Sequence, residues 1–205
     1  MYTPKHFEEN NLAVAHTTMA ANSFALVCVS DQGGVDAAHV PVVLDRSAGE
    51  FGELHFHVAK QNPIWQAFDG QREALVIFSG PHAYISADWY DSENLVPTWN
   101  YVAVHATGVP SVISEDQNAA LLDALAAQEE AHLAPKSPWT TAKMESDLHK
   151  RMLGGIVGLA MPIGKLEAKA KLSQNRPDND KVGVIQGLRK RGGDMEQAIA
   201  SLMET

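Results

Sequence analysis

Residues 24–45 read FALVCVSDQGGVDAAHVPVVLD, and this stretch decides the class of fold. Its first seven residues form an apolar run with the length and valine content of a buried strand. The glycines at 33 and 34 supply the positive φ that a tight reversal needs, so residues 35–45 read as a returning strand, interrupted at Pro41. The stretch therefore predicts an antiparallel β-hairpin.

Further strand patterns follow at intervals of eight to twelve residues. Residues 54–58 and 99–107 alternate, residues 74–78 form an apolar core run that breaks at 79–81 and resumes at 83–86, and a last strand is expected around 155–172. Five or six strands at this spacing favour an antiparallel β-barrel with helical additions over a βαβ sheet. We expect a mainly β fold with added helices, in the α+β class.

Helical composition marks residues 12–22, and Asn62 with Pro63 resembles a helix start. Ser114 followed by acidic residues predicts the N-terminus of a long helix over 115–134. Shorter helices are expected near 144–153, 182–191 and 194–203. The helices thus fall mainly in the second half of the chain.

The composition excludes several classes of protein. With 205 residues, 45% of them hydrophobic and 20% charged, the chain has the profile of a globular protein and not of a disordered one. No apolar run approaches the roughly 20 residues that a membrane-spanning helix needs. The N-terminal residues show no export signal, so a cytoplasmic location is expected.

Charge is distributed unevenly. Residues 1–135 carry 4 Lys and Arg against 17 Asp and Glu, whereas residues 136–191 carry 12 against 5. Within the basic stretch, Lys165, Lys169, Lys171 and Arg176 fall close together. They suit an anion such as a phosphate, but a solvated basic surface explains them equally well.

Few short motifs point to chemistry. His55 and His57 share one face of a predicted strand, but no further ligands accompany them, so we expect no metal. The single cysteine, Cys28, lies in an apolar run and reads as a buried, inert thiol. Glycine-rich dinucleotide and triphosphate loops are absent from the sequence.

Aromatic residues gather beside small polar ones in residues 79–101, which contain Trp89, Tyr90, Trp99 and Tyr101. Flat apolar faces with adjacent donors and acceptors suit a planar heteroaromatic ligand. Ordinary core packing is the alternative for the same residues.

Taken in order, several motifs resemble the PaiB-type FMN-binding negative transcriptional regulators, over nearly the whole chain. The motifs are residues 1–7 (MYTPKHF), 39–41 (HVP), 57–65 (HVAKQNPIW), 74–86 (ALVIFSGPHAYIS), 89–90 (WY), 96–101 (VPTWNY), 156–158 (IVG), 171–176 (KLSQNR) and 183–188 (GVIQGL).

The resemblance implies a flavin-binding split β-barrel, with FMN in a cleft near the interface of a homodimer. We expect this domain over residues 1–175 and a helical extension over 176–205. Lysine, arginine, hydroxyl and amide donors would serve the flavin phosphate, and the residues near Ser79, Trp89 and Trp99 would serve the ring. The predicted cofactor-binding positions are Lys60, Asn62, Ser79, Trp89, Thr98, Trp99, Asn100, Lys171, Ser173, Gln174 and Arg176.

Two positions depart from the family pattern, which has arginine where Lys60 stands and glycine where Phe56 stands. Lysine lacks the planar two-donor contact that arginine makes with a phosphate, and phenylalanine adds bulk. Weaker phosphate binding or reduced access for the ring is the expected consequence.

Three functions are consistent with these observations. The first is a flavin-binding protein with weak oxidoreductase activity, in which FMN does the chemistry. The second is a transcriptional regulator; direct DNA binding is doubtful, because the chain is acidic and has no recognisable helix-turn-helix. The third is a haem-binding or haem-degrading protein of the same barrel class, suggested by the nine histidines.

Overall fold

The computed structural model describes residues 1–31 and 33–204, and their fold is α+β with antiparallel strand pairing, as predicted. The strands are β1 (Glu8–Glu9), β2 (Phe24–Asp31), β3 (Gly34–Asp45), β4 (Glu53–Ala59), β5 (Ala74–Ile85), β6 (Thr98–Gly108), β7 (Ser111–Val112) and β8 (Ile156–Lys171). The α-helices are α1 (Leu12–Ala21), α2 (Glu115–Glu130), α3 (Ser146–Leu153), α4 (Asp178–Arg191) and α5 (Asp194–Met203). Short 3-10 turns are η1 (Lys5–Phe7), η2 (Pro63–Ala67), η3 (Ala87–Trp89), η4 (Ala131–Leu133) and η5 (Thr141–Lys143).

The hairpin of residues 24–45 is confirmed, but the expected interruption at Pro41 is wrong. β2 pairs with β3 from Phe24 opposite Pro41 to Asp31 opposite Gly34, and β3 then continues against β4 from Val42 onward. Pro41 therefore lies where one ladder ends and the next begins, and its missing N–H breaks neither. Gln32, in the predicted turn, lies outside the described residues.

Backbone pairing joins the strands in the order β1-β8-β4-β3-β2-β5-β6, with β7 beside β8. A further pairing between β8 and β6 links the ends of this order. The strands thus form a partly closed ring, in agreement with the predicted antiparallel split barrel, and the described part contains eight of them instead of five or six.

β5 corrects a second prediction, since it runs unbroken from Ala74 to Ile85 through the expected break at residues 79–81. Its ladder with β2 ends at Ile77. Beyond Ile77, β5 no longer donates backbone hydrogen bonds to β2. Pro81, which has no N–H group, is therefore tolerated within the strand.

The helices agree with the sequence except at two ends. α2 begins after Ser114 with the predicted cap, whose side chain accepts from the N–H of Gln117, but it ends at Glu130, and η4 replaces the last predicted turn. α4 begins at Asp178, four residues earlier than predicted. None of the described helices has the length and apolar character to cross a membrane.

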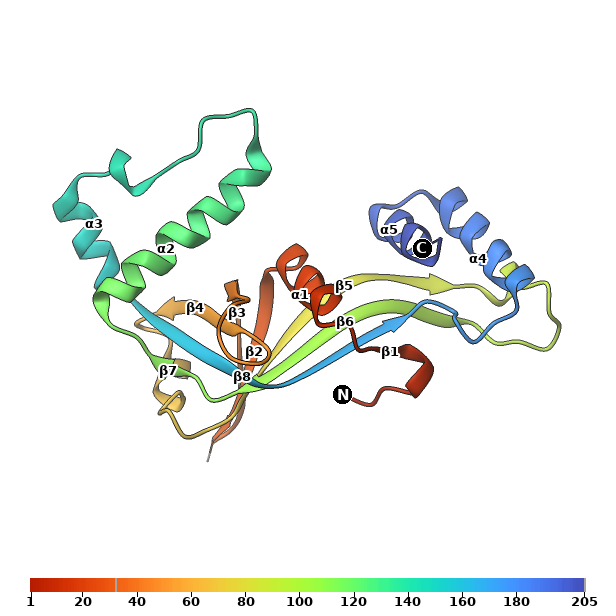
Figure 1. The fold of residues 1–205 in the computed structure, drawn as a ribbon, viewed down its shortest axis with the longest axis horizontal. Helices are drawn as coiled ribbons and strands as arrows, with labels where there is room; N and C mark the ends of the chain where they lie inside the picture. Colours follow the sequence, from red (N-terminus) through yellow and green to blue (C-terminus); the bar gives the residue numbers. More distant parts are fainter. Residues whose placement is uncertain (32, 205) are drawn as a thin grey trace. The chain divides into compact units, whose positions relative to one another are not determined.

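The chain divides into two compact units, and β5, β6 and β8 supply residues to both. Unit 2 contains Met19–Phe78 and His105–Leu166. Its core is built from the inward faces of β4 and β8, where Leu54, Phe56 and Leu159 are fully buried. Within this unit α2 lies over β3 and β4 (Figure 1).

Unit 1 contains Met1–Thr18, Ser79–Val104 and the residues from Glu167 on. α4 and α5 pack side by side (Figure 1) and bury Val184, Leu188 and Ile199 against Ala83 and Ile85 of β5. A domain boundary at residue 175 stays a prediction.

Candidate functional site

The end of β8 carries two lysines on one face, because side chains two residues apart in a strand point the same way. Lys171 donates from Nζ to Oγ1 of Thr98 on β6, within unit 1. Lys169 donates from Nζ to the backbone carbonyl of Tyr2, at 3.1 Å. Both ammonium groups are therefore held in place by neutral acceptors.

Aromatic rings surround these ammonium groups. Nζ of Lys169 lies 5.1 Å from the ring centroid of Tyr101 and 5.9 Å from that of Tyr2, and Nζ of Lys171 lies 6.0 Å from that of Phe7. Lys169 is only 7% exposed, so these rings replace water around a positive charge. Such contacts offset part of the cost of burying a lysine.

The turn after β8 is fixed by a residue in an uncommon conformation. Ser173 is buried and has a φ of 63°, in the left-handed region that residues other than glycine seldom adopt. Nδ2 of the fully buried Asn100 donates to Oγ of Ser173 at 3.0 Å, and the carbonyl of Ser173 accepts from the N–H of Arg176 at 3.0 Å. Gln174 closes the turn by donating to the carbonyl of Ala170 and accepting from the N–H of Leu172. The turn determines where Arg176 lies.

Arg176 lies over the ring of Tyr90, with its guanidinium carbon 5.2 Å from the centroid. Burial raises the pKa of the Tyr90 hydroxyl, and the charge of Arg176 opposes that rise. Burial lowers the pKa of Lys171, and the charges of Lys169 and Arg176 lower it further. The three cations are thus close enough to repel one another.

In the described part of the chain, none of Lys169, Lys171 and Arg176 has a carboxylate within ion-pair distance. The charge of Arg176 also reaches Asp180, but Oδ1 of that carboxylate accepts the N–H groups of Asp91 and Ser92 at 2.9 Å each. Three positive side chains with too little negative charge among them have the chemistry of an anion-binding site.

Comparison with known proteins shows which family the chain belongs to. Residues 1–165 match the model of the family described as "Putative FMN-binding domain". The chain belongs to this FMN-binding family. The PaiB-type resemblance is confirmed as well, because the chain is 36% identical to "Protease synthase and sporulation protein PAI 2" of Bacillus subtilis, over 100% of this chain and 97% of that protein. The chain is also 29% identical to an uncharacterised protein of Emericella nidulans, over 82% and 81% of the two chains.

Solved structures of flavin-binding proteins have a similar fold. A structure of an FAD- and haem-binding protein from Mycobacterium smegmatis matches with a TM-score of 0.60 and 17% identity, over 91% of this chain and 80% of that one. The flavocytochrome Anf3 from Azotobacter vinelandii matches with a TM-score of 0.54 and 13% identity, over 82% and 72%. At these identities the likeness concerns the fold alone.

The structure places the other predicted FMN positions in different surroundings. Trp99 is 53% exposed and lies beside His82 and Tyr84 of β5, with ring centroids 6.1 and 6.0 Å away. Ser79 is exposed at the start of the β5 segment that belongs to unit 1. Trp89, at the end of η3, packs its indole against α4 at Gly187.

Lys60 and Asn62 belong to unit 2. The side chain of Asn62 caps η2 by accepting from the N–H of Ile64 at 3.1 Å, and the carbonyl of Lys60 accepts from Nε1 of Trp65 at 2.9 Å. Phe56, the second position with an expected departure, is fully buried and meets Phe68 edge-to-face at 6.0 Å between centroids. Its bulk therefore fills the core of unit 2.

Sequence reasoning did not assign Tyr2 and Phe7 to the site. It placed Tyr101 among aromatic residues that suit a planar ligand and Lys169 in a basic stretch that suits an anion, but it named neither as a cofactor-binding position. Phe7 and Tyr2 lie in the first family motif, and Lys169 precedes Lys171 by two residues, which is the strand spacing for one face. That spacing was the available signal. Among the described residues, no group of three His, Cys, Asp or Glu side chains could hold a metal ion.

Proposed function

We propose that this FMN-binding protein holds the flavin phosphate on Lys171 and Arg176, with Lys169 adding positive charge behind them. The observation that carries the proposal is the cluster of three cations without a carboxylate partner in the described chain. A phosphate monoester carries close to two negative charges near neutral pH. It would offset the charges of Lys169 and Arg176, which add to the effect of burial in lowering the pKa of Lys171.

The donors present fit a phosphate. Arginine offers several N–H donors in one plane and lysine a compact charge, which is the pair of side chains that phosphates commonly meet in proteins. The hydroxyl of Thr98, which accepts from Lys171, adds a donor of its own. Asn100 and Ser173 are buried and bonded to each other, so their part in the proposal is to shape the turn that presents Arg176.

For the flavin ring we propose Trp99 with its neighbours Tyr84 and His82, an aromatic surface on β5 and β6 that is open to solvent at Trp99. A second copy of the chain would cover such a surface, in keeping with the homodimer that the family resemblance implies. Ser79, Lys60, Asn62 and Gln174 stay predicted contacts. When bound, FMN supplies electron or hydride transfer, while the chain binds and orients it.

The biological role is proposed by likeness. The name of the Bacillus subtilis relative links that protein to protease synthesis and sporulation, which supports a regulatory role for this chain, exerted without direct contact with DNA. Haem binding is the second candidate, because one structure of similar fold is described as that of an FAD- and haem-binding protein. A Soret band after haem addition distinguishes the two cofactors.

Titration of the apoprotein with FMN and with riboflavin, followed by quenching of flavin fluorescence, tests the proposal. FMN is expected to bind more tightly than riboflavin, which lacks the phosphate. Arg176→Ala should lower the affinity for FMN by roughly tenfold to a hundredfold, or about 1.5–3 kcal/mol of binding free energy. It should leave the affinity for riboflavin nearly unchanged. Lys190→Ala, an exposed cation on α4, is the matched control and should change neither affinity.

Equal affinity for the two flavins would contradict the phosphate assignment. No binding of either flavin would contradict the function itself. A larger effect of Lys190→Ala than of Arg176→Ala would place the phosphate elsewhere.

A further inference from the structure

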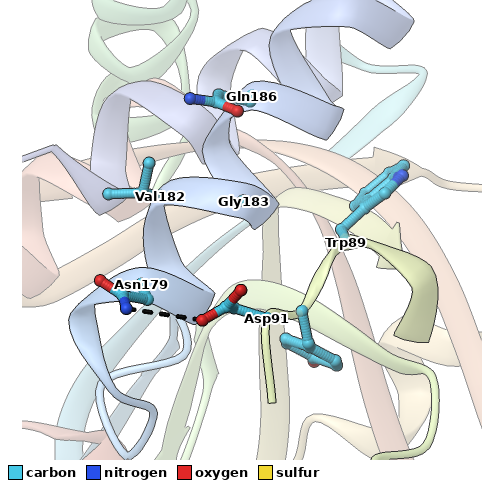
Figure 2. Close-up of a pocket in the computed structure, with 7 residues that line it drawn as sticks. Trp89, Asp91, Asn179, Val182, Gly183 and Gln186 are labelled. Atoms are coloured by element: carbon cyan, nitrogen blue, oxygen red, sulfur yellow. Dashed lines mark hydrogen bonds between the residues drawn. The ribbon is translucent and has the colours of Figure 1, made fainter. Parts of the chain in front are cut away.

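A surface groove of about 360 Å³ lies in unit 1 beside α4, and the cation cluster does not use it. One face of the helix supplies Asn179, Val182, Gly183 and Gln186, and the end of η3 with the following residues supplies the rest. Figure 2 shows the side chains of Val182, Asn179, Asp91 and Trp89 arranged around Gly183. The volume falls in the range of about 300–1,000 Å³ that small-molecule sites occupy.

Close packing of Trp89 on two glycines shapes this groove. A Cβ added to Gly183 would lie 2.0 Å from the carbonyl oxygen of Trp89, and one added to Gly187 would lie 2.3 Å from the indole ring. Any larger residue at these positions would push Trp89 away from the helix. Trp89 is therefore fixed against the helix where it lines the groove, and Val182, 52% exposed, adds an apolar surface.

The lining of the groove carries one charged acceptor, the carboxylate of Asp91, beside the side-chain amides of Asn179 and Gln186, which both donate and accept. Nδ2 of Asn179 points toward Oδ2 of Asp91 at 3.5 Å, which leaves the amide oxygen of Asn179 turned away from that contact (Figure 2). Asp91 forms no ion pair in the part of the chain that the structure describes. A carboxylate and a carboxamide oxygen call for a ligand that donates hydrogen bonds and carries positive charge.

The surrounding charge favours a cation too. The lining contains no lysine or arginine, and Lys181, next to it on the helix, is paired with Asp178 at 2.9 Å. Asp178 and Asp180 in the first turn of α4 offset the partial positive charge of that helix end. Arg176, over the ring of Tyr90, is the opposing charge that a cation would meet from the neighbouring cluster.

We propose that this groove binds an organic ammonium ion with a flat apolar body. The ammonium group donates to the carboxylate of Asp91, and the apolar body packs against Trp89 and Val182. An indole face attracts cations as well as apolar groups, so one wall serves both parts of the ligand. The site is of opposite charge to the phosphate site and does not depend on FMN binding.

Three probes of one shape test the sign of the charge: benzylammonium, benzyl alcohol and benzoate. Each is titrated into the whole protein while the indole N–H signal of Trp89 and the amide signal of Gly183 are followed by ¹H–¹⁵N NMR. Benzylammonium is expected to shift both signals saturably and to bind more tightly than the other two. Its affinity should fall as NaCl is raised to about 1 M, because salt screens a partly exposed ion pair.

Asp91→Asn removes the charge of the side chain and keeps its shape. It should lower the affinity for benzylammonium by roughly threefold to fivefold, which is the effect expected from the loss of a partly exposed ion pair. The matched control is Asp88→Asn, an exposed neighbour on η3 that does not line the groove and should leave the affinity unchanged. The proposal is overturned if benzyl alcohol or benzoate binds as tightly, if neither signal shifts, or if the two variants behave alike. Flavin titration is a separate measurement, so failure here leaves the FMN assignment intact.

Discussion

Ser173 shows how one residue can set a functional geometry. Its left-handed backbone lets the chain turn sharply between β8 and α4, and the pair of hydrogen bonds with Asn100 holds that conformation in place. Residues in sparsely populated regions of backbone space persist only where their surroundings determine them. The strain at Ser173 is therefore tied to the position of Arg176, three residues later.

Asp180 is a second residue whose environment has a measurable consequence. Its carboxylate is buried and accepts two backbone N–H groups, and the bond from Ser92 is the largest cause of a pKa below the ordinary 3.8. A carboxylate with a lowered pKa in the folded state stabilises the protein above its unfolded pKa. This contribution disappears as the pH falls through the folded-state pKa.

We therefore expect Asp180→Asn to flatten the acid limb of the stability profile. The melting temperature of the wild type should fall from about pH 4 downward, and that of the variant should fall less steeply over the same range. Thermal melts followed by circular dichroism from pH 3 to 7 give both profiles. Asp178→Asn, at a carboxylate that is 93% exposed, serves as the control. Parallel profiles for wild type and Asp180→Asn would show that this carboxylate does not govern the acid limb.

At the scale of elements, α4 was harder to predict than α5. The polar run of residues 178–181 looks like a loop by composition, but Pro177 precedes the helix and Asp178 and Asp180 stabilise its first turn. In β5, Ser79, Gly80 and Pro81 are residues typical of a turn. The strand nevertheless continues through them, because its ladder with β2 has already ended at Ile77. For β5 the deciding feature is the pairing with a strand distant in the sequence, whereas for α4 it is the local chemistry of the first turn.

Gly187→Ala tests the packing of α4 on Trp89. In an exposed helix interior this change would stabilise by about 1 kcal/mol, but here the new methyl group would overlap the indole, so a loss of about 1–3 kcal/mol is expected. Urea unfolding measures the difference. Combining it with Trp89→Ala should recover much of the Gly187→Ala loss, because the ring that obstructs the methyl group is gone. Additive effects in the double variant would show that the two residues do not interact.

At the scale of the whole molecule, the sequence predicted the family and the α+β class, since the motifs occur in order along the chain. It could not assemble the candidate site. Lys171 meets Thr98, and Lys169 meets Tyr2 and Tyr101, through contacts that span many residues, and neither spacing nor composition encodes them. Lys60 and Asn62, which the family motifs group with these residues, belong to unit 2 and stay predicted contacts.

The net charge of −9 predicts weak contact with nucleic acid. We expect no retardation of duplex DNA in a gel shift at about 50 mM salt, conditions that favour electrostatic binding. Retardation that disappears with added salt would contradict this, and comparison with Arg176→Ala would show whether the cation cluster is responsible. A regulatory role, if exerted, would then act through another molecule.

The cation cluster also bears on how the protein is handled. Three like charges held together attract the anions in solution, so sulfate or phosphate in a storage buffer would compete for the phosphate site that we propose for FMN. Such buffers would stabilise the cofactor-free protein and compete with FMN when the cofactor is added back. Purification in a chloride salt with a bulky organic buffer would leave the cation cluster free to bind the cofactor.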